Sequence, residues 1–454
     1  MDDAVQIPSN LLSRFKSAAS EVDKAYEVRV ISHNDADGIS SAAIVCAMLF
    51  RKNKRFQCTM LKGFEEAVVR TTAQGCDLLI ISDMGSSSLD VLESLPVKVI
   101  ILDHHKPERD SNSTKLIHVN PHLFGIDGAT SACAASVAMT LAVTVSEKNW
   151  DLLPIAFGGI VGDRQTIRGL LGLNKYLGQI GQEKHILELR KGSLLPSGPL
   201  KDSLLNSTDP FISGVSGDPD GVSRLLTETG ILDSMTLESL DEAQEMKLSS
   251  LVTLRLLNQG ATLDNLEEAS SEKYFFSERK TYGHELSNLM NACGRSDVTG
   301  MGAAVVLGDA KSLEKAEGLR QDYRKQVLEA VLAVQFKGLK QLDYLQYFFS
   351  PVPDVSSDLC GIVMQWIGDR DKPTIALSQK NGDVKISSRA NKKMIEAGVD
   401  LSYALRTAAA AVGGVGGGHN VASGGKIPAG KEDEFIAMLN KIIGEQRSKS
   451  KKTA

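Results

Sequence analysis

The chain of 454 residues is too long for one compact hydrophobic core, which predicts two or three domains. Its 42% hydrophobic and 24% charged residues are typical of a globular protein, and no apolar run approaches the roughly 18 residues of a membrane helix. The net charge of -5 excludes the overall positive charge that is typical of nucleic-acid-binding proteins, so any binding to DNA or RNA must rest on local basic patches.

The cysteines and the amino terminus indicate a cytoplasmic protein with no membrane partner. Met1–Ala4 lacks the basic and apolar pattern of a signal peptide. The cysteines follow no zinc-binding spacing, and most lie in apolar segments, so we expect reduced core residues. These six residues are Cys46, Cys58, Cys76, Cys133, Cys293 and Cys360.

Apolar runs alternate with helical patterns along the first 160 residues. Strands are expected at 27–32, 56–60, 77–82, 97–102 and 116–119. Helices are expected at 9–26, 39–50, 64–72, 88–95, 129–145 and 151–160. This alternation predicts a parallel sheet with right-handed crossovers, because parallel strands need such connections.

The character of the chain changes after about residue 190. Residues 192–220 are rich in Ser, Pro and Gly and predict a surface loop or loose connector, and 221–270 predict polar helices. Further helices are expected at 283–293, 313–334 and 432–446, and strands at 344–349, 374–378 and 384–388. We therefore expect an α/β fold with a parallel-sheet domain at 1–190, a loop and helical connector at 191–300 and a smaller α/β domain at 301–454.

Acidic and imidazole side chains follow three of the expected strands. They are His33, Asp35 and Asp37; Asp83; and Asp103, His104 and His105, with Asp163 at a junction between helix and loop. Taken singly, Asp83 is explained as a helix cap, Asp37 as part of an Asp-Gly turn and His122 as a loop histidine. Taken together, they fall where a parallel sheet binds its ligands, which favours a functional site.

Carboxylates and imidazoles without thiolates suit Mn²⁺, Mg²⁺ or Fe²⁺ better than a structural zinc. Four crowded aspartates repel one another unless about two divalent cations neutralise them. Two such ions can activate a shared water and stabilise the leaving oxygen of a phosphoester. The residues alone therefore predict a two-metal phosphoesterase.

Four motifs resemble those of the DHH phosphoesterase superfamily, and the resemblance implies a role for each residue. The motifs are His33-x-Asp35-x-Asp37-Gly38, Asp83-x-Gly85, Asp103-His104-His105 and Gly162-Asp163. Asp83 would bridge two ions, most often Mn²⁺ and alternatively Mg²⁺. Asp35, with His33, would bind the first ion, and Asp37, His104 and Asp163 the second. Asp103 would orient a neighbouring side chain, and His105 would face the scissile phosphate.

A second informative stretch is glycine-rich and runs from Val412 to Gly425. It lacks the Gly-Lys-Ser/Thr of a P-loop, so a flexible hinge is one interpretation and a phosphate-binding loop the other. With Arg389, the residues Gly416, Gly417, Gly418 and His419 resemble the substrate-binding loop of the DHH-associated carboxyl-terminal domain, which lies across the cleft from the metals in that family. The candidates for groove-lining cations are Arg164, Arg389, Lys392, Lys393 and Lys426.

Two other segments, Ser287–Arg295 and Ser207–Pro210 with Ser216-Gly217, are similar to archaeal RecJ-like proteins. The resemblance implies an exonuclease acting on single-stranded DNA or RNA, with replication or repair proteins as further partners. One alternative is a phosphodiesterase of short oligonucleotides or cyclic dinucleotides. Another is a replication scaffold, because the superfamily includes helicase-associated subunits that have lost catalysis. The four intact motifs favour catalysis.

Overall fold

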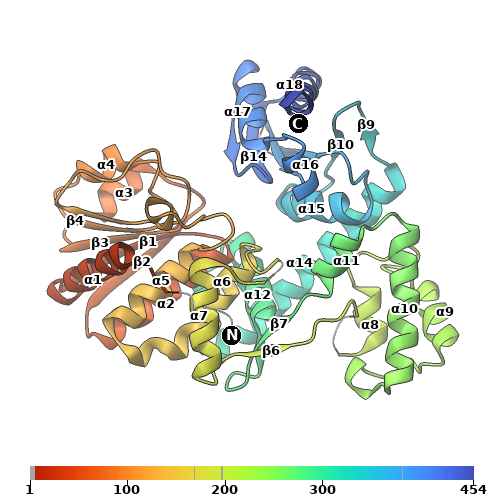
Figure 1. Cartoon of the computed structure of the whole chain (residues 1–454), viewed down its shortest axis with the longest axis horizontal. Coiled ribbons are helices and arrows are strands. Elements are labelled where there is room, and N and C mark those ends of the chain that lie inside the picture. Colours follow the sequence, from red (N-terminus) through yellow and green to blue (C-terminus); the bar gives the residue numbers. More distant parts are fainter. Residues whose placement is uncertain (1–5, 168, 196–197, 381, 454) are drawn as a thin grey trace. The chain divides into compact units, whose positions relative to one another are not determined.

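The computed structural model describes residues 6–167, 169–195, 198–380 and 382–453. The chain divides into two compact units, each built from two stretches of sequence (Figure 1). Unit 1 comprises Met1–Lys191 and Ser271–Arg320, and unit 2 comprises Gly192–Ser270 and Gln321–Ala454. Segment 271–320 thus belongs to the same compact unit as the amino-terminal sheet, whereas we expected three consecutive domains.

Unit 1 is built on a five-stranded parallel sheet, which confirms the predicted fold class. Its strand order is β2-β1-β3-β4-β5. The strands are β1 (Glu27–His33), β2 (Arg55–Leu61), β3 (Leu78–Ser82), β4 (Lys98–Leu102) and β5 (Leu116–Val119). Strand β3 is buried at every position, as expected of a parallel strand covered on both faces.

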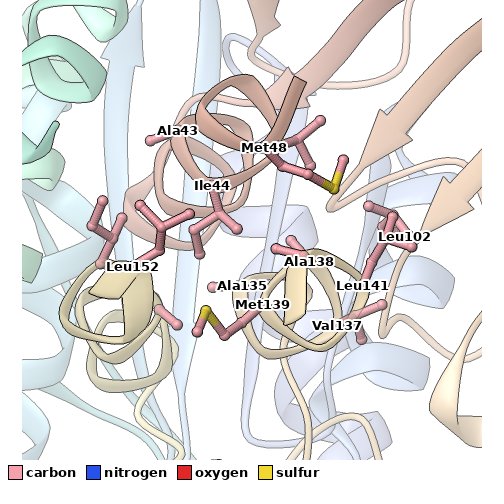
Figure 2. Packing of buried hydrophobic residues seen from close by; sticks show 14 of the residues in the cluster. Ala43, Ile44, Met48, Leu102, Ala135, Val137, Ala138, Met139, Leu141 and Leu152 are labelled. Atoms are coloured by element: carbon pink, nitrogen blue, oxygen red, sulfur yellow. The ribbon is translucent and has the colours of Figure 1, made fainter. Parts of the chain in front are cut away.

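Helices cover both faces of this sheet. The first stretch of unit 1 contains α1 (Ser9–Lys24), α2 (Ala36–Arg51), α3 (Glu66–Thr72), α4 (Leu89–Glu93), α5 (Ala134–Val145), α6 (Leu153–Gly162) and α7 (Gly172–Glu183). One sheet face packs on α1, α2 and α5, and the other packs on α3 and α4. Figure 2 shows Ile44 and Met48 of α2 against Ala135, Ala138 and Met139 of α5. The small side chains of α5 let the two helices pack closely, and this packing places both helix amino termini at the same sheet edge.

The second stretch of unit 1 adds a small sheet and further helices. These elements are β7 (Lys273–Phe276), β8 (Thr281–Tyr282), α12 (Gly283–Arg295) and α13 (Thr299–Val306), with β6 (Glu188–Arg190) pairing to β7. Helix α12 packs on α6 and α2, where Met290 joins the main core of the unit. The long helix α14 (Ala310–Lys337) then leads into unit 2.

Unit 2 contains a six-stranded mixed sheet with the order β13-β14-β12-β11-β10-β9. The strands are β9 (Lys340–Gln341), β10 (Gln346–Phe349), β11 (Thr374–Lys380), β12 (Asp383–Arg389), β13 (Val415–Gly418) and β14 (Ala422–Pro428). The helices are α8 (Leu200–Leu205), α9 (Pro219–Thr229), α10 (Glu242–Asn258), α11 (Leu263–Ala269), α15 (Ser356–Trp366), α16 (Lys392–Glu396), α17 (Leu401–Ala411) and α18 (Glu432–Thr453).

Two predictions for the second half are wrong. Part of the expected loose connector at 192–220 forms α8, and Leu204, Phe211 and Ile212 fill a core of unit 2. The apolar residues of this core are scattered among Ser, Pro and Gly, so the composition of the segment did not predict the core. The expected glycine loop is a β-hairpin in which only residues 419–421 form the turn.

None of the described helices has the length and apolar character needed to cross a membrane.

Candidate metal centre

The predicted ligands meet at the carboxyl edge of the parallel sheet of unit 1. His33 ends β1, Asp83 follows β3 and Asp103 follows β4. Strand β3 pairs with both β1 and β4, so the ends of these three strands lie side by side. Asp83 has a φ of 58°, an uncommon left-handed conformation that turns the chain sharply at the strand end.

One cluster comprises His33, Asp35 and Asp83. The Nδ1 atom of His33 lies 2.9 Å from Oδ2 of Asp35 and 3.4 Å from Oδ2 of Asp83. One potential ligand atom from each residue lies within 4.8 Å of the other two. Asp35 is also the N-cap of α2, where its side chain accepts a hydrogen bond from the Gly38 amide.

A second cluster comprises Asp37, His104 and Asp163, again with ligand atoms within 4.8 Å. The Nε2 atom of His104 lies 3.7 Å from Oδ2 of Asp37, and its Nδ1 atom lies 3.7 Å from Oδ2 of Asp163. The same Nε2 lies 3.3 Å from Oδ1 of Asp83. Asp83 therefore reaches His33 of the first cluster with one oxygen and His104 of the second with the other.

Helix α5 holds the Asp37 carboxylate from its amino terminus. The backbone amides of Ala134 and Ala135 donate hydrogen bonds of 2.8 Å to the two carboxylate oxygens. These amides have no partners within the helix, so the carboxylate satisfies them. Burial, reinforced by Asp83 and Asp163, raises the pKa of Asp37. Burial also raises the pKa of the adjacent Cys133, so its thiol stays protonated and the donor set consists of carboxylates and imidazoles.

Asp103 is buried and holds the two histidines in place. One of its oxygens accepts hydrogen bonds from the backbone amides of His104 and His105 and from Nδ1 of His105, which lies 2.8 Å away. The other oxygen accepts from the Ser86 amide. Burial raises the pKa of Asp103, but the hydrogen bond from His105 and the nearby histidine charges outweigh it, so the pKa is lowered. The His105 side chain is 46% exposed, so it sits at the open side of the centre.

In the metal-free centre, imidazoles with raised pKa values lie among buried carboxylates. Burial lowers the pKa of His33, but the charges and hydrogen bonds of Asp35 and Asp83 outweigh burial, so the pKa is raised to about 11. For His104, the charges of Asp163, Asp83 and Asp37 outweigh burial, so its pKa is also raised. Burial, opposed by His104, raises the pKa of Asp163 to about 6. Hard oxygen and imidazole donors in this number suit divalent cations, so the residues present fit a divalent metal centre.

Three residues that are not among the predicted site residues contact the centre. The side chain of Gln165 contacts Asp163, and the carbonyl of Gly128 accepts a hydrogen bond from Nδ1 of His104. Asn291 of α12 accepts a hydrogen bond from the Ala36 amide, between Asp35 and Asp37. Asn291 lies in the segment similar to archaeal RecJ-like proteins, and that similarity was the only signal for it.

The predicted substrate residues lie in unit 2 and come together in its sheet. Arg389 at the end of β12 pairs with Ala422, and Gly418 pairs with Ser423 on the same strand, so the His419 turn lies near Arg389. Arg389 donates a 2.6 Å hydrogen bond to Ser357. Of the other candidate cations, Lys392, Lys393 and Lys426 form ion pairs with acidic residues of unit 2, and Arg164 adjoins Asp163 in unit 1.

Comparison with known proteins identifies the family. Residues 27–159 match the amino-terminal domain of the DHH family, and residues 345–445 match the DHHA1 domain. An uncharacterized protein of Methanocaldococcus jannaschii is 29% identical over 427 residues, which cover 92% of this chain and 94% of that protein. The protein belongs to the DHH superfamily.

Two solved structures share the fold. RecJ from Thermus thermophilus, in complex with Mn²⁺, matches with a TM-score of 0.62 and 17% identity. The match covers 98% of this chain and 56% of that RecJ chain, so this protein spans little more than half the length of that RecJ. CDC45 from Entamoeba histolytica matches with a TM-score of 0.63 and 12% identity over 96% of this chain and 99% of that chain. The protein is thus a DHH-superfamily member with a RecJ-like fold.

Proposed function

We propose that this protein is a metal-dependent exonuclease that hydrolyses single-stranded DNA or RNA and acts in DNA repair or replication. The observation that carries the proposal is the pair of ligand clusters, His33, Asp35 and Asp83 beside Asp37, His104 and Asp163. Asp83 touches a histidine of each cluster, which is the arrangement that a bridging carboxylate needs. The manganese complex of the Thermus RecJ supports Mn²⁺ as the ion, with Mg²⁺ as the alternative.

Each cluster would hold one divalent ion, and the ions would activate water and stabilise the charge that develops on the phosphate. The residues of the chain orient the reaction. Asp103 fixes the ring of His105, and this hydrogen bond raises the pKa of His105 despite burial, so that the ring is protonated more readily. A protonated His105 on the open side would donate a hydrogen bond to the scissile phosphate.

The hairpin β13–β14 would bind the nucleotide chain. At Gly416 a Cβ atom would lie 2.9 Å from the carbonyl oxygen of Leu405 in α17, so packing requires glycine. At Gly417, apart from its two chain neighbours, none of the described residues has an atom within 4 Å of such a Cβ, so packing does not require glycine there. A glycine that the fold does not need fits close approach by a substrate phosphate to the backbone. Arg389 and His419 would add donors beside it.

The hairpin assignment is tested by Gly417→Ala. We expect this variant to keep its melting temperature and to bind a labelled single strand at least several-fold more weakly. The matched variant Gly63→Ala changes another glycine with open space around its Cβ, in unit 1, and should bind normally. Normal binding by Gly417→Ala would remove the hairpin from the proposed substrate site.

Catalysis is tested by Asp83→Asn. Asparagine tolerates the left-handed φ of this position, so the variant keeps the backbone and loses the bridging charge. With Mn²⁺ and an end-labelled single strand, we expect cleavage to fall by at least a hundredfold while thermal unfolding stays cooperative. Undiminished cleavage by the folded variant would refute the proposed mechanism.

Two other functions are distinguished by simple assays. A phosphodiesterase of short oligonucleotides would hydrolyse dinucleotides at least as fast as strands of about 20 nucleotides. Nucleotides far from the scissile bond would contribute no binding energy to its reaction. The likeness to CDC45 along nearly all of that chain favours a replication scaffold as the second candidate. A scaffold would cleave no strand with either Mn²⁺ or Mg²⁺, although its fold would be intact.

A further inference from the structure

We propose that Gln165 is a positioning residue that fixes both Asp163 and His104 and thereby sets the affinity of the second ligand cluster for its ion. The inference rests on the proposed metal centre. It concerns a side chain that none of the four motifs contains, although Gln165 lies only two residues beyond Asp163.

The backbone at the end of α6 brings Gln165 into the centre. Asp163 is the C-cap of this helix, and Arg164 follows in the left-handed conformation with a φ of 57°. The Arg164 amide donates to the carbonyl of Val161, and the Gln165 amide donates to the carbonyl of Ile160. These two bonds form a Schellman motif, which reverses the chain sharply and turns Gln165 back toward the ligand that precedes it.

The amide group of Gln165 is buried and fully engaged. Its Nε2 atom lies 2.7 Å from Oδ2 of Asp163, 2.8 Å from the carbonyl oxygen of Gly128 and 3.1 Å from that of Ala132. Its Oε1 atom accepts a 2.7 Å hydrogen bond from Nδ2 of Asn174. Three acceptors around one end and a donor at the other allow only one orientation of the amide.

Gly128 extends this control to His104. The Nδ1 atom of His104 lies 2.7 Å from the Gly128 carbonyl oxygen, so Nδ1 carries the proton and donates it. The other ring nitrogen, Nε2, then faces Asp37 and Asp83 as the atom available to an ion. Because the Gln165 amide donates to the same carbonyl oxygen, one side chain fixes two of the three ligands in the second cluster.

The first cluster does not share this support. The described hydrogen bonds of Gln165 go to Asp163, Gly128, Ala132 and Asn174, and none goes to a residue of the first cluster. Loss of a hydrogen bond that orients a metal ligand typically lowers metal affinity by about 10- to 100-fold. We therefore expect a selective loss at one of two sites, which a general loosening of the fold would not produce.

The variant Gln165→Met tests the inference, because methionine has a similar length and cannot make these hydrogen bonds. Calorimetric titration of the metal-free protein with Mn²⁺ should show two ions per chain for the wild type. In Gln165→Met, one ion should bind about 10- to 100-fold more weakly and the other within about twofold of the wild type. Asn149→Leu removes another buried amide of unit 1, which bonds Ala142 and Arg51, and should leave both affinities unchanged.

Asn174→Leu keeps Gln165 but removes the hydrogen bond donated to its Oε1 atom, so it decides the question if Gln165→Met fails to fold. A selective loss in either variant supports the inference. Unchanged binding, or equal weakening at both sites, overturns it. A wild type that binds two ions but cleaves no strand would refute the proposed exonuclease and leave the role of Gln165 standing, so the two failures are distinguishable.

Discussion

Replacing Asp163 with asparagine should stabilise the metal-free protein at neutral pH. Burial raises the pKa of Asp163 from 3.8 to about 6, because His104 only partly offsets the burial and the charge of Asp83 adds to it. The folded protein therefore holds this proton more tightly than the unfolded chain does. The contribution of Asp163 to stability therefore falls as pH rises from about 4 to about 6, and its full penalty is present above that range.

The size of the effect follows from this pKa. A rise from 3.8 to about 6 corresponds to at most about 3 kcal/mol of lost stability. The side chain is 31% exposed, so solvent screening reduces the expected effect to about 1–2 kcal/mol. Asparagine does not titrate in this range, and its carbonyl oxygen can still accept the hydrogen bond from Gln165.

Urea unfolding in the presence of a chelator, between pH 4 and pH 7.5, measures the difference directly. The variant and the wild type should be nearly equal at pH 4, and Asp163→Asn should gain about 1–2 kcal/mol by pH 7. Asp151→Asn changes an exposed carboxylate just before the opposite end of α6 and serves as the control. An Asp163→Asn variant that is less stable than the wild type at pH 7, or a difference that does not depend on pH, would refute the reasoning.

Three further predictions follow from the same geometry. An ion must displace the proton of Asp163, so this group alone should raise Mn²⁺ affinity about tenfold from pH 5 to pH 7. Calorimetry measures the affinity, and an affinity that does not change with pH would contradict the prediction. Gly128→Ala would place a Cβ atom 1.9 Å from the His104 carbonyl oxygen, so thermal unfolding should show a loss of about 1–3 kcal/mol, against none for Gly63→Ala. Asn291→Ala leaves the Ala36 amide without its 3.0 Å acceptor, so the variant should lose about 1–3 kcal/mol of stability and bind Mn²⁺ more weakly. A variant with the stability and Mn²⁺ affinity of the wild type would show that the contact is dispensable.

The sequence predicts the sheet of unit 1 well, because its strands are continuous apolar runs. The expected strands at 77–82 and 97–102 differ from β3 and β4 by one residue at one end.

The sequence predicts unit 2 less well, for two reasons. Glycines have no preference for strands, so the hairpin of β13 and β14 looks like a loop. Helix α17, rich in alanine, was missed although its Leu401, Ala404 and Leu405 pack in the core.

The candidate ligands were predictable because charged residues after buried strands converge at one sheet edge. Apart from Asp103, which the family resemblance implied, the residues that orient them were not predictable, because their partners are set by the fold. Asn291 lies 255 positions from Ala36, and no local pattern links the two. Gln165 lies next to a motif, but only the Schellman turn after α6 shows that its side chain points back to Asp163. Hydrogen bonds between distant segments are a tertiary property, and spacing in one sequence does not reveal them.

The central claim is that this protein shortens single strands at a two-metal centre. A time course with single strands of DNA and RNA of about 20 nucleotides, labelled at the 5′ or 3′ end, tests it most directly. With Mn²⁺, the wild type should release nucleotides progressively from one end, and Asp83→Asn or an excess of chelator should stop the reaction. Strands that stay intact while the wild type binds two ions per chain would contradict the claim.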